Sequence, residues 1–239
     1  MDKLGLQTDT LPTPTAERPL LGLTVLVIED SRYACEAMRL LCLRSGARIR
    51  RADCMRAARR HLQVYRPSVV IADLGLPDGN GIDLIHELSR AQNRVDAILA
   101  ISGDTHLAPD AIAAGADGFI EKPLTSLAQF QQSVLSVLPP DRQPKGVRAV
   151  VDETVEPDEI AYQDDMAHIA DVLDDSGDSV TLDYVAQFLG GVARSASDTA
   201  LEQAALALAE KRALGQPAET ERATIAGLVQ NRLSQRIAI

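Results

Sequence analysis

The stretch Ser68-Val69-Val70-Ile71-Ala72-Asp73-Leu74-Gly75-Leu76-Pro77-Asp78-Gly79-Asn80-Gly81 decides the fold predicted for this chain. Its first five residues are small or apolar, which is typical of a strand covered on both faces of a parallel sheet. The glycines and the proline that follow indicate a turn. Asp73 therefore lies where a buried strand ends. Because ligands gather at the carboxyl ends of parallel strands, Asp73 is the first candidate for a functional residue.

Three further apolar runs end in polar residues. Glu29-Asp30 follow residues 25–28, Ser102 follows 97–101, and Lys122-Pro123 begin two residues after the run 118–120. In a parallel sheet these ends meet at one edge. The sequence thus predicts one pocket that holds three carboxylates, a hydroxyl and an ammonium group.

Short apolar runs alternate with helical patterns from residue 21 to 138. We expect strands near 23–28, 47–51, 68–72, 96–101 and 118–121, and helices near 31–45, 53–65, 81–92, 105–115 and 124–138. Five such units predict an α/β fold with a five-stranded, parallel, doubly wound sheet of flavodoxin-like order 2-1-3-4-5. Ser31 and Asp53 are the expected N-caps of the first two helices, and Asn80-Gly81 should open the third.

The chain divides into four segments. Residues 1–20 are expected to be a flexible lead, 21–138 the α/β domain and 139–157 a linker that is rich in proline and then extended or mobile. Residues 158–239 predict an all-α bundle, with helices near 158–174, 178–194, 197–212 and 218–236. Their short connections favour antiparallel neighbours.

Composition and charge narrow the functional classes. The chain has no apolar run of about 18 residues, so no membrane helix is expected. Cys35 and Cys42 lie seven residues apart on one face of an expected helix, which indicates small core residues in a protein of the reducing cytoplasm. Residues 151–239 hold 6 Lys or Arg and 17 Asp or Glu, a net charge of −11 within a total of −10. Since cations that replace phosphate counterions supply much of the affinity for nucleic acid, the acidic half is not expected to bind DNA.

The ordered strand-end residues resemble the receiver (CheY-like) domain of two-component response regulators over about residues 21–138. The resemblance implies that Asp73 accepts a phosphoryl group from a histidine kinase or a histidine phosphotransfer protein. It further implies that Glu29, Asp30, Asp73 and the backbone carbonyl of Gly75 bind Mg²⁺, that Ser102 and Lys122 contact the phosphoryl group, and that Phe119 is the aromatic switch residue that follows Ser102.

Each of these residues alone has a simpler interpretation. Glu29-Asp30 suit a helix start, Ser102 opens a common turn, and Phe119 is equally suited to a core. Their combination carries the prediction, because phosphoryl transfer needs a nucleophilic oxygen and cations around it. Gly75 offers no side chain that could shield the phosphoryl group or orient water, and the sequence does not give the lifetime of that group.

The helical half has a faint resemblance to histidine phosphotransfer domains in Gln187-Phe188-Leu189-Gly190-Gly191 and in residues 201–205. Gln187 would take the histidine position and Gly190 the lysine position. A glutamine cannot relay phosphate, so the bundle would be a degenerate copy that docks a receiver, its own or another. The alternative is a bundle for interaction or dimerisation. His168 lies outside this motif and is taken as incidental.

Two functions remain from the sequence, and neither is an enzyme. The first is a cytoplasmic response regulator that signals to an unknown protein, with a homodimer left open. The second is an adaptor with constitutive protein binding and vestigial phosphorylation. A flavodoxin-like enzyme is disfavoured, since acidic Glu29-Asp30 replace a cofactor loop after the first strand. The basic stretch that includes Arg48, Arg51 and Arg60 either docks an acidic partner, such as the helical half, or is a solvated face.

Overall fold

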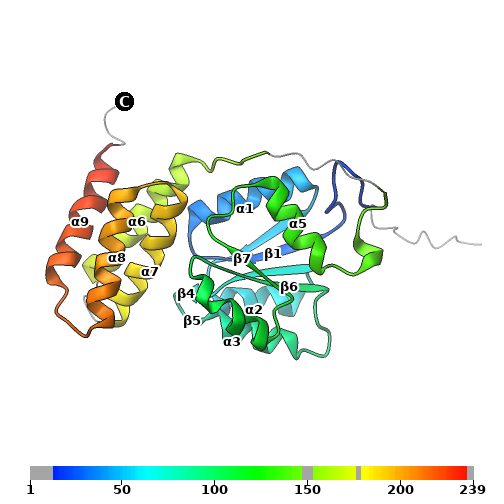
Figure 1. Ribbon diagram of the computed structural model, residues 1–239, viewed down its shortest axis with the longest axis horizontal. Helices are drawn as coiled ribbons and strands as arrows, with labels where there is room; N and C mark the ends of the chain where they lie inside the picture. The colour runs from blue at the N-terminus through cyan, green and yellow to red at the C-terminus, as the bar shows by residue number, and fades with distance from the viewer. Residues whose placement is uncertain (1–12, 147–152, 176–178, 236–239) are drawn as a thin grey trace, which may run out of the picture.

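A computed structural model of the chain describes residues 13–146, 153–175 and 179–235, and it shows an α/β domain beside a helical bundle (Figure 1). The main sheet is parallel, with strands β1 (Thr24–Ile28), β2 (Arg48–Ala52), β3 (Val69–Asp73), β6 (Ala97–Ser102) and β7 (Gly118–Glu121). Their spatial order is β2-β1-β3-β6-β7. In chain order this is 2-1-3-4-5, so the predicted fold class and strand order are confirmed, with the alternating strand β2 at an edge.

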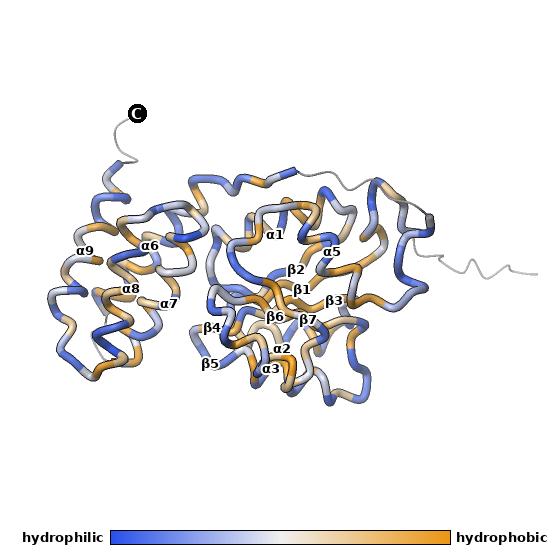
Figure 2. The backbone as a smooth tube through the Cα atoms, in the orientation of Figure 1, coloured by the Kyte–Doolittle hydropathy of each residue, from blue (hydrophilic) through white to orange (hydrophobic). Residues whose placement is uncertain are grey.

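Helices cover both faces of this sheet. The five helices are α1 (Arg32–Ser45), α2 (Met55–Val64), α3 (Gly81–Ser89), α4 (Ala108–Ala114) and α5 (Leu127–Val137). Val25 and Val27 point to the core shared with α1 and α5, whereas Leu26 and Ile28 point to the core shared with α2, α3 and α4. Strand side chains alternate between faces, so both must be apolar. In Figure 2 the tube through the centre of the sheet is largely orange, as expected for apolar strands.

The helix starts follow the predictions with one correction. Ser31 accepts a hydrogen bond from the Ala34 N–H, and Asn80 accepts one from Ile82. Asp53, however, does not cap α2. The N-cap is Cys54, and Asp78 from the turn after β3 accepts hydrogen bonds from the first two N–H groups of α2, at 2.8 and 2.9 Å. A carboxylate distant in sequence thus satisfies the helix end.

Two local elements differ from the sequence prediction. A two-stranded hairpin, β4 (Gly75–Leu76) and β5 (Gly79–Asn80), lies between β3 and α3, where only a turn was expected. The helix expected over 105–115 is split into a 3₁₀ turn, η1 (Thr105–Leu107), and α4. Proline occupies the first turn of α4, where its missing N–H costs no hydrogen bond and its fixed φ favours a new helix start.

The domain borders are tighter than expected where they are described. Leu20, assigned to the flexible lead, is fully buried and donates its N–H to the Ser45 carbonyl at 2.9 Å. Val155, assigned to the mobile end of the linker, is 1 % exposed in the same core. Its N–H donates to the Thr125 carbonyl, so it is fixed beside the start of α5. Residues 1–12 and 147–152 of the predicted lead and linker lie outside the described residues. Pro140–Arg142 form a short 3₁₀ turn, η2.

The bundle comprises α6 (Glu159–Asp175), α7 (Ser179–Ser195), α8 (Thr199–Ala213) and α9 (Glu219–Ser234), close to the predicted ranges. Every helix contributes fully or almost fully buried residues to one core, among them Met166, Leu189, Leu208 and Ile225. Within the described residues, no helix combines the length and apolar character required to cross a membrane.

One carboxylate links three helices of the bundle. Asp198 caps α8 and accepts hydrogen bonds from the Tyr162 hydroxyl of α6 at 2.7 Å and from both Arg232 nitrogens of α9 that face it, at 2.7 and 3.0 Å. The bonds from Arg232 contribute most to lowering the pKa of Asp198 to about 2. This pair is mostly shielded from solvent, so its contribution should be measurable.

We predict that Asp198→Asn destabilises the bundle by about 2 kcal/mol at pH 7. The folded state lowers this pKa, so the stabilisation is present above about pH 4 and is lost as the pH falls toward 2. Urea unfolding at several pH values, followed by circular dichroism, measures both effects. Asp183→Asn is the control, because the Asp183–Arg212 pair is more than half exposed on its acidic side and should contribute little. Equal losses in the two variants would contradict the assignment.

Candidate functional site

The strand ends bring the predicted acidic residues together. Ile28 pairs with Ala72, so Glu29, Asp30 and Asp73 emerge side by side from β1 and β3. Each offers a carboxylate oxygen, and these oxygens all lie within 4.8 Å of one another. Lys122, after β7, places its Nζ 2.6 Å from Glu29 Oε2 and 3.2 Å from Asp73 Oδ1. Four of the five expected groups thus surround one point, and the fifth, the Ser102 hydroxyl, lies at the adjacent end of β6.

Burial makes this cluster electrostatically strained. Burial and then the neighbouring Asp73 charge raise the pKa of Asp30 to about 6. The pKa of Glu29 is raised mainly by burial, although Lys122 opposes this. Burial alone would lower the pKa of Lys122, but Asp73 and Glu29 outweigh it and raise that pKa. The lysine therefore stays charged and offsets part of the carboxylate repulsion.

The donor set fits a hard divalent cation. Mg²⁺ prefers oxygen ligands and uses one or two carboxylates together with waters and phosphate oxygens. Glu29, Asp30 and Asp73 offer such carboxylates here, and Lys122 already pairs with two of them, Glu29 at 2.6 Å and Asp73 at 3.2 Å. A cation would also relieve the repulsion that raises the pKa of Asp30. The residues present are therefore suitable for Mg²⁺.

Ser102 and Phe119 occupy neighbouring strands. Ser102 is 4 % exposed, and its Oγ accepts the Asp104 N–H at 3.1 Å, which orders the loop after β6. Phe119 of β7 pairs with Ala100 and packs, partly buried, against the core beneath α3 and α4. Its roles as a core residue and as a moving aromatic both remain predictions.

Gly81 is required by the backbone around Asp73. A Cβ atom at position 81 would lie 2.0 Å from the Asp73 carbonyl oxygen, a backbone atom that cannot move aside cheaply. The β4–β5 hairpin therefore folds tightly against the end of β3. This close approach fixes the start of α3 beside the acidic cluster.

The bundle docks on this same edge, first through α6. Asp165 is 1 % exposed, although it belongs to the bundle. It accepts hydrogen bonds from the Ser31 hydroxyl at 2.7 Å and from the N–H groups of Arg32 and Tyr33 at 2.7 and 3.1 Å. An acid is favourable at a helix N-terminus, where N–H groups lack partners. Asp165 thus completes the start of α1 from another domain.

A second contact reaches a predicted metal ligand. The Tyr184 hydroxyl of α7 donates to Asp30 Oδ2 at 2.9 Å. Burial, followed by the Asp30 charge, raises the pKa of Tyr184, so the hydroxyl keeps its proton. His168 Nε2 lies 3.0 Å from the same hydroxyl oxygen and must donate, since the single hydroxyl proton is used. The sequence interpretation took His168 as incidental, but in the structure His168 positions Tyr184.

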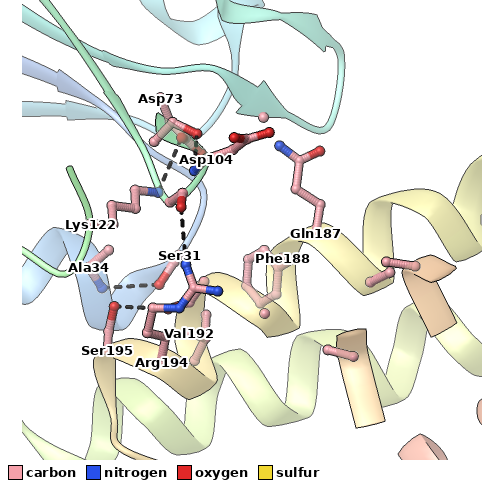
Figure 3. A pocket seen from close by; sticks show the side chains of 18 of the residues that line it. Ser31, Ala34, Asp73, Asp104, Lys122, Gln187, Phe188, Val192, Arg194 and Ser195 are labelled. Carbon is pink, nitrogen blue, oxygen red and sulfur yellow. Dashed lines mark hydrogen bonds and ion pairs between the residues drawn. The ribbon is translucent and has the colours of Figure 1, made fainter. Parts of the chain in front are cut away.

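Two further residues of α7 face the edge of the sheet that holds the acidic cluster. Arg194 donates to the Gly103 carbonyl at 3.1 Å and is held by Glu202 at 2.8 Å. Gln187 extends toward β4, where a Cβ atom on Gly75 would lie 1.8 Å from its amide nitrogen. Figure 3 shows Gln187 on the helix wall of a pocket whose opposite wall holds Asp73, Asp104 and Lys122. The cavity between them has a volume of about 500 Å³.

The basic stretch of the sheet domain also faces the bundle. Arg51, Arg56 and Arg60 line a cleft whose other wall includes Asp164 and Asp171 of α6. Among the described residues, Arg32–Asp164 is the only ion pair across this cleft, at 3.8 Å and largely exposed. The basic stretch and the acidic half thus face each other with opposite charges across this cleft.

Sequence reasoning missed Asp165, Tyr184 and Arg194. Each lies in an amphipathic helix and looks like an ordinary surface or core residue. Their partners lie more than 90 residues away along the chain, as for the 134 residues between Ser31 and Asp165. No local spacing could have indicated these contacts.

Comparisons with known proteins agree with the α/β half of this architecture. The response regulator receiver domain family matches residues 25–134. The Escherichia coli KDP operon transcriptional regulatory protein KdpE is 29 % identical over 99 residues, which cover 41 % of this chain and 44 % of that protein. The Mycobacterium tuberculosis transcriptional regulatory protein KdpE is 34 % identical over 99 residues, with the same coverages.

Solved structures also match about half of this chain. The chemotaxis response regulator CheY4 of Vibrio cholerae is 23 % identical, with a TM-score of 0.44, and the match covers 48 % of this chain and 98 % of that one. The chain spans about half the length of the curated relatives it matches, such as 44 % for KdpE and 53 % for the Escherichia coli protein DpiA.

We predict that Asp165→Asn weakens docking of the bundle by about 2 kcal/mol, roughly 30-fold in the docking equilibrium. An amide keeps one acceptor oxygen and turns an NH₂ group toward N–H donors that three hydrogen bonds now satisfy. Small-angle X-ray scattering should show a larger radius of gyration, and proteases should cut near residues 156–158.

The neighbouring substitution Asp164→Asn is the matched control. Asp164 makes only the exposed 3.8 Å pair with Arg32, so its loss should leave the compact form unchanged. If the two variants behave alike, the Asp165 contacts do not hold the domains together.

Proposed function

We propose that this chain, whose residues 25–134 are a response regulator receiver domain of two-component signalling, accepts a phosphoryl group on Asp73. The donor would be a histidine kinase or a histidine phosphotransfer protein, and the output would pass through protein contacts of the helical bundle. One observation supports this most directly. The acidic cluster, with Lys122 inside it, lies at the same edge of the sheet to which the bundle docks.

The residues of the cluster suit phosphoryl transfer. Asp73 is the carboxylate nucleophile, and attack on phosphorus gives a mixed anhydride that stores the group transiently. Lys122, 3.2 Å from Asp73, offsets the charge of the transferred oxygens, and the Ser102 hydroxyl ends the adjacent strand. Mg²⁺ held by Glu29, Asp30, Asp73 and the Gly75 carbonyl would supply further charge neutralisation and orientation.

The bundle is proposed to be a degenerate phosphotransfer domain. Gln187, at the position where such a domain carries histidine, lies on the face of α7 that lines the Asp73 pocket. This placement favours the phosphotransfer ancestry over an unrelated interaction bundle. Since an amide cannot form a phosphoramidate, the bundle docks its own receiver domain without relaying the group.

Docking gives phosphorylation a route to the output. A donor histidine must reach Asp73 from the side that α7 now covers, so the bundle has to move aside for phosphorylation. The added group brings about −1.5 to −2 charges and three acceptors. These acceptors would pull Ser102 and its loop toward the phosphoryl group. The Gly103 carbonyl of this loop accepts a hydrogen bond from Arg194. The docking equilibrium, and thus exposure of α6 and α7 to a downstream protein, would depend on Asp73.

The proposed output is a protein contact, not DNA binding. The matched relatives are named transcriptional regulators, but the similarity covers about half of each. The C-terminal segment of this chain carries a net charge of −11, which opposes contact with phosphates. A cytoplasmic location is part of the proposal, and a homodimer is left open.

The alternative is an adaptor that binds partners constitutively. It is favoured by the docking contacts of Asp165 and Tyr184, because neither of them involves the Asp73 side chain. The two functions differ in whether the state of Asp73 changes which proteins are bound.

We predict that the full chain, incubated with magnesium and acetyl phosphate, gains one phosphoryl group on Asp73. Intact mass measurement and a phosphate-affinity gel detect the adduct, which Asp73→Asn should abolish. Lys122→Ala should lower the yield at least tenfold, because the cation beside the acceptor oxygen is lost.

Pull-downs with wild-type protein treated with beryllofluoride and with Asp73→Asn then separate the two functions. Different partner sets support the response regulator. Identical sets, or no adduct on Asp73, favour the adaptor.

A further inference from the structure

The receiver domain lacks a side chain at a position that the bundle fills. Gly75 lies two residues after Asp73, at the rim of the pocket. A Cβ atom there would lie 1.8 Å from Nε2, 2.5 Å from Cδ and 3.1 Å from Oε1 of Gln187. The amide therefore occupies the space where a side chain of residue 75 would begin. α7 supplies to the phosphorylation pocket a polar group that the receiver sequence itself omits.

The amide is available for a solvent molecule or ligand. Gln187 is exposed, and no hydrogen bond to its side chain is found among the described residues. It opens into the cavity of about 500 Å³ that Asp73 and Lys122 line from the opposite wall (Figure 3). Since a water takes about 30 Å³, this volume holds a phosphoryl group and several waters.

Water can reach the amide along α7. Gly190 and Gly191 line the same cavity, and a Cβ atom on either would meet no atom within 4 Å. At the positions three and four residues after Gln187, α7 thus has no side chain that could cover the amide. Solvent can enter on the helix side, opposite the Asp73 carboxylate, which is the side from which in-line attack on an Asp73 phosphoryl group must come.

We propose that Gln187 orients the water that hydrolyses the Asp73 phosphoryl group, so that the docked bundle is a built-in phosphatase. This rests on the proposed phosphorylation of Asp73. Glutamine amides orient attacking water in GTP hydrolysis because they offer both a donor and an acceptor. The docked bundle then has a chemical role that its inability to carry phosphate does not remove.

The proposed step balances. The water oxygen forms a bond to phosphorus, and the bond between phosphorus and the Asp73 carboxylate oxygen breaks. The electron pair of the broken bond stays on the carboxylate, next to Lys122. The water proton passes to the departing phosphate, so that the acyl phosphate and water give free Asp73 carboxylate and dihydrogen phosphate. No redox partner or further group is needed.

A steric role for Gln187 predicts the opposite behaviour. If the amide only blocks the pocket, its removal admits water and shortens the lifetime of the phosphoryl group. If it orients water, its removal lengthens that lifetime. The sign of the change therefore separates the two.

The test follows loss of the phosphoryl group from the full chain. The protein is labelled with acetyl phosphate and magnesium, the donor is removed by rapid desalting, and phosphate release is timed with magnesium present. Gln187→Ala should slow release by about 10- to 100-fold, the range expected when a reacting group loses its orientation. Gln203→Ala, an exposed glutamine of α8 that does not line the cavity, is the control and should match wild type.

Gly75→Ala tests the same contact from the receiver side. The added methyl group must displace the amide, so release should slow, and adding Gln187→Ala should slow it little further. Scattering profiles of the variants check that docking persists. In ¹⁵N spectra the side-chain NH₂ signals of Gln187 should shift when Asp73 is phosphorylated and stay unchanged in Asp73→Asn.

An unchanged or shorter lifetime in Gln187→Ala overturns this inference while leaving phosphorylation of Asp73 intact. Additive slowing by Gly75→Ala and Gln187→Ala also overturns it, because the two changes would then act separately. If wild-type protein forms no adduct on Asp73, the inference fails together with the proposed function.

Discussion

A buried ammonium group among carboxylates is the constraint from which the functional edge follows. Taking Lys122, Glu29 and Asp73 out of water is costly, and the cost is offset only if their charges lie close together, as they do at 2.6 and 3.2 Å. That geometry requires β1, β3 and β7 to end at the same level, which the parallel register provides. It also leaves Asp30 with a raised pKa, which a bound cation would lower. Structure and chemistry at this edge are therefore set by the same electrostatic balance.

The bundle contacts this edge through polar groups, and its apolar core is separate from the two cores of the sheet domain. Asp165 completes the start of α1, Tyr184 binds Asp30, and Arg194 holds the loop after β6. Each contact lies close to the groups that would respond to added charge if Asp73 were phosphorylated, as we propose. Hydrogen bonds to charged groups contribute roughly 1.5–3 kcal/mol each, so a small number of them can hold two domains in an equilibrium that remains reversible. Such an interface is suited to regulation, whereas a large apolar interface would be permanent.

Much of this arrangement was predictable from the sequence. Consecutive apolar residues such as Val69–Ala72 indicate a covered strand, and the strand-end residues converge because all parallel strands point one way. Helix ends were predictable where the cap is local, as for Ser31, and not for α2, whose first N–H groups are satisfied by Asp78. The orientation of the bundle was beyond sequence reasoning, because Asp165 and Tyr184 look like ordinary helix residues until distant partners are known. The sequence indicated Gln187 through its motif, but its position beside Gly75 depends on how the bundle docks.

The anchoring of Val155 in the core of the sheet domain limits how far the domains can separate. Only residues 156–158 connect this anchor to the first residue of α6, and four peptide steps span about 14 Å at most. An undocked bundle therefore stays connected by a short linker, and its effective concentration near the sheet edge remains in the millimolar range or above. Any other protein that seeks the same edge competes against a neighbour that cannot diffuse away. The covalent connection between the domains thus keeps other proteins from this edge, even where each hydrogen bond across the interface is weak.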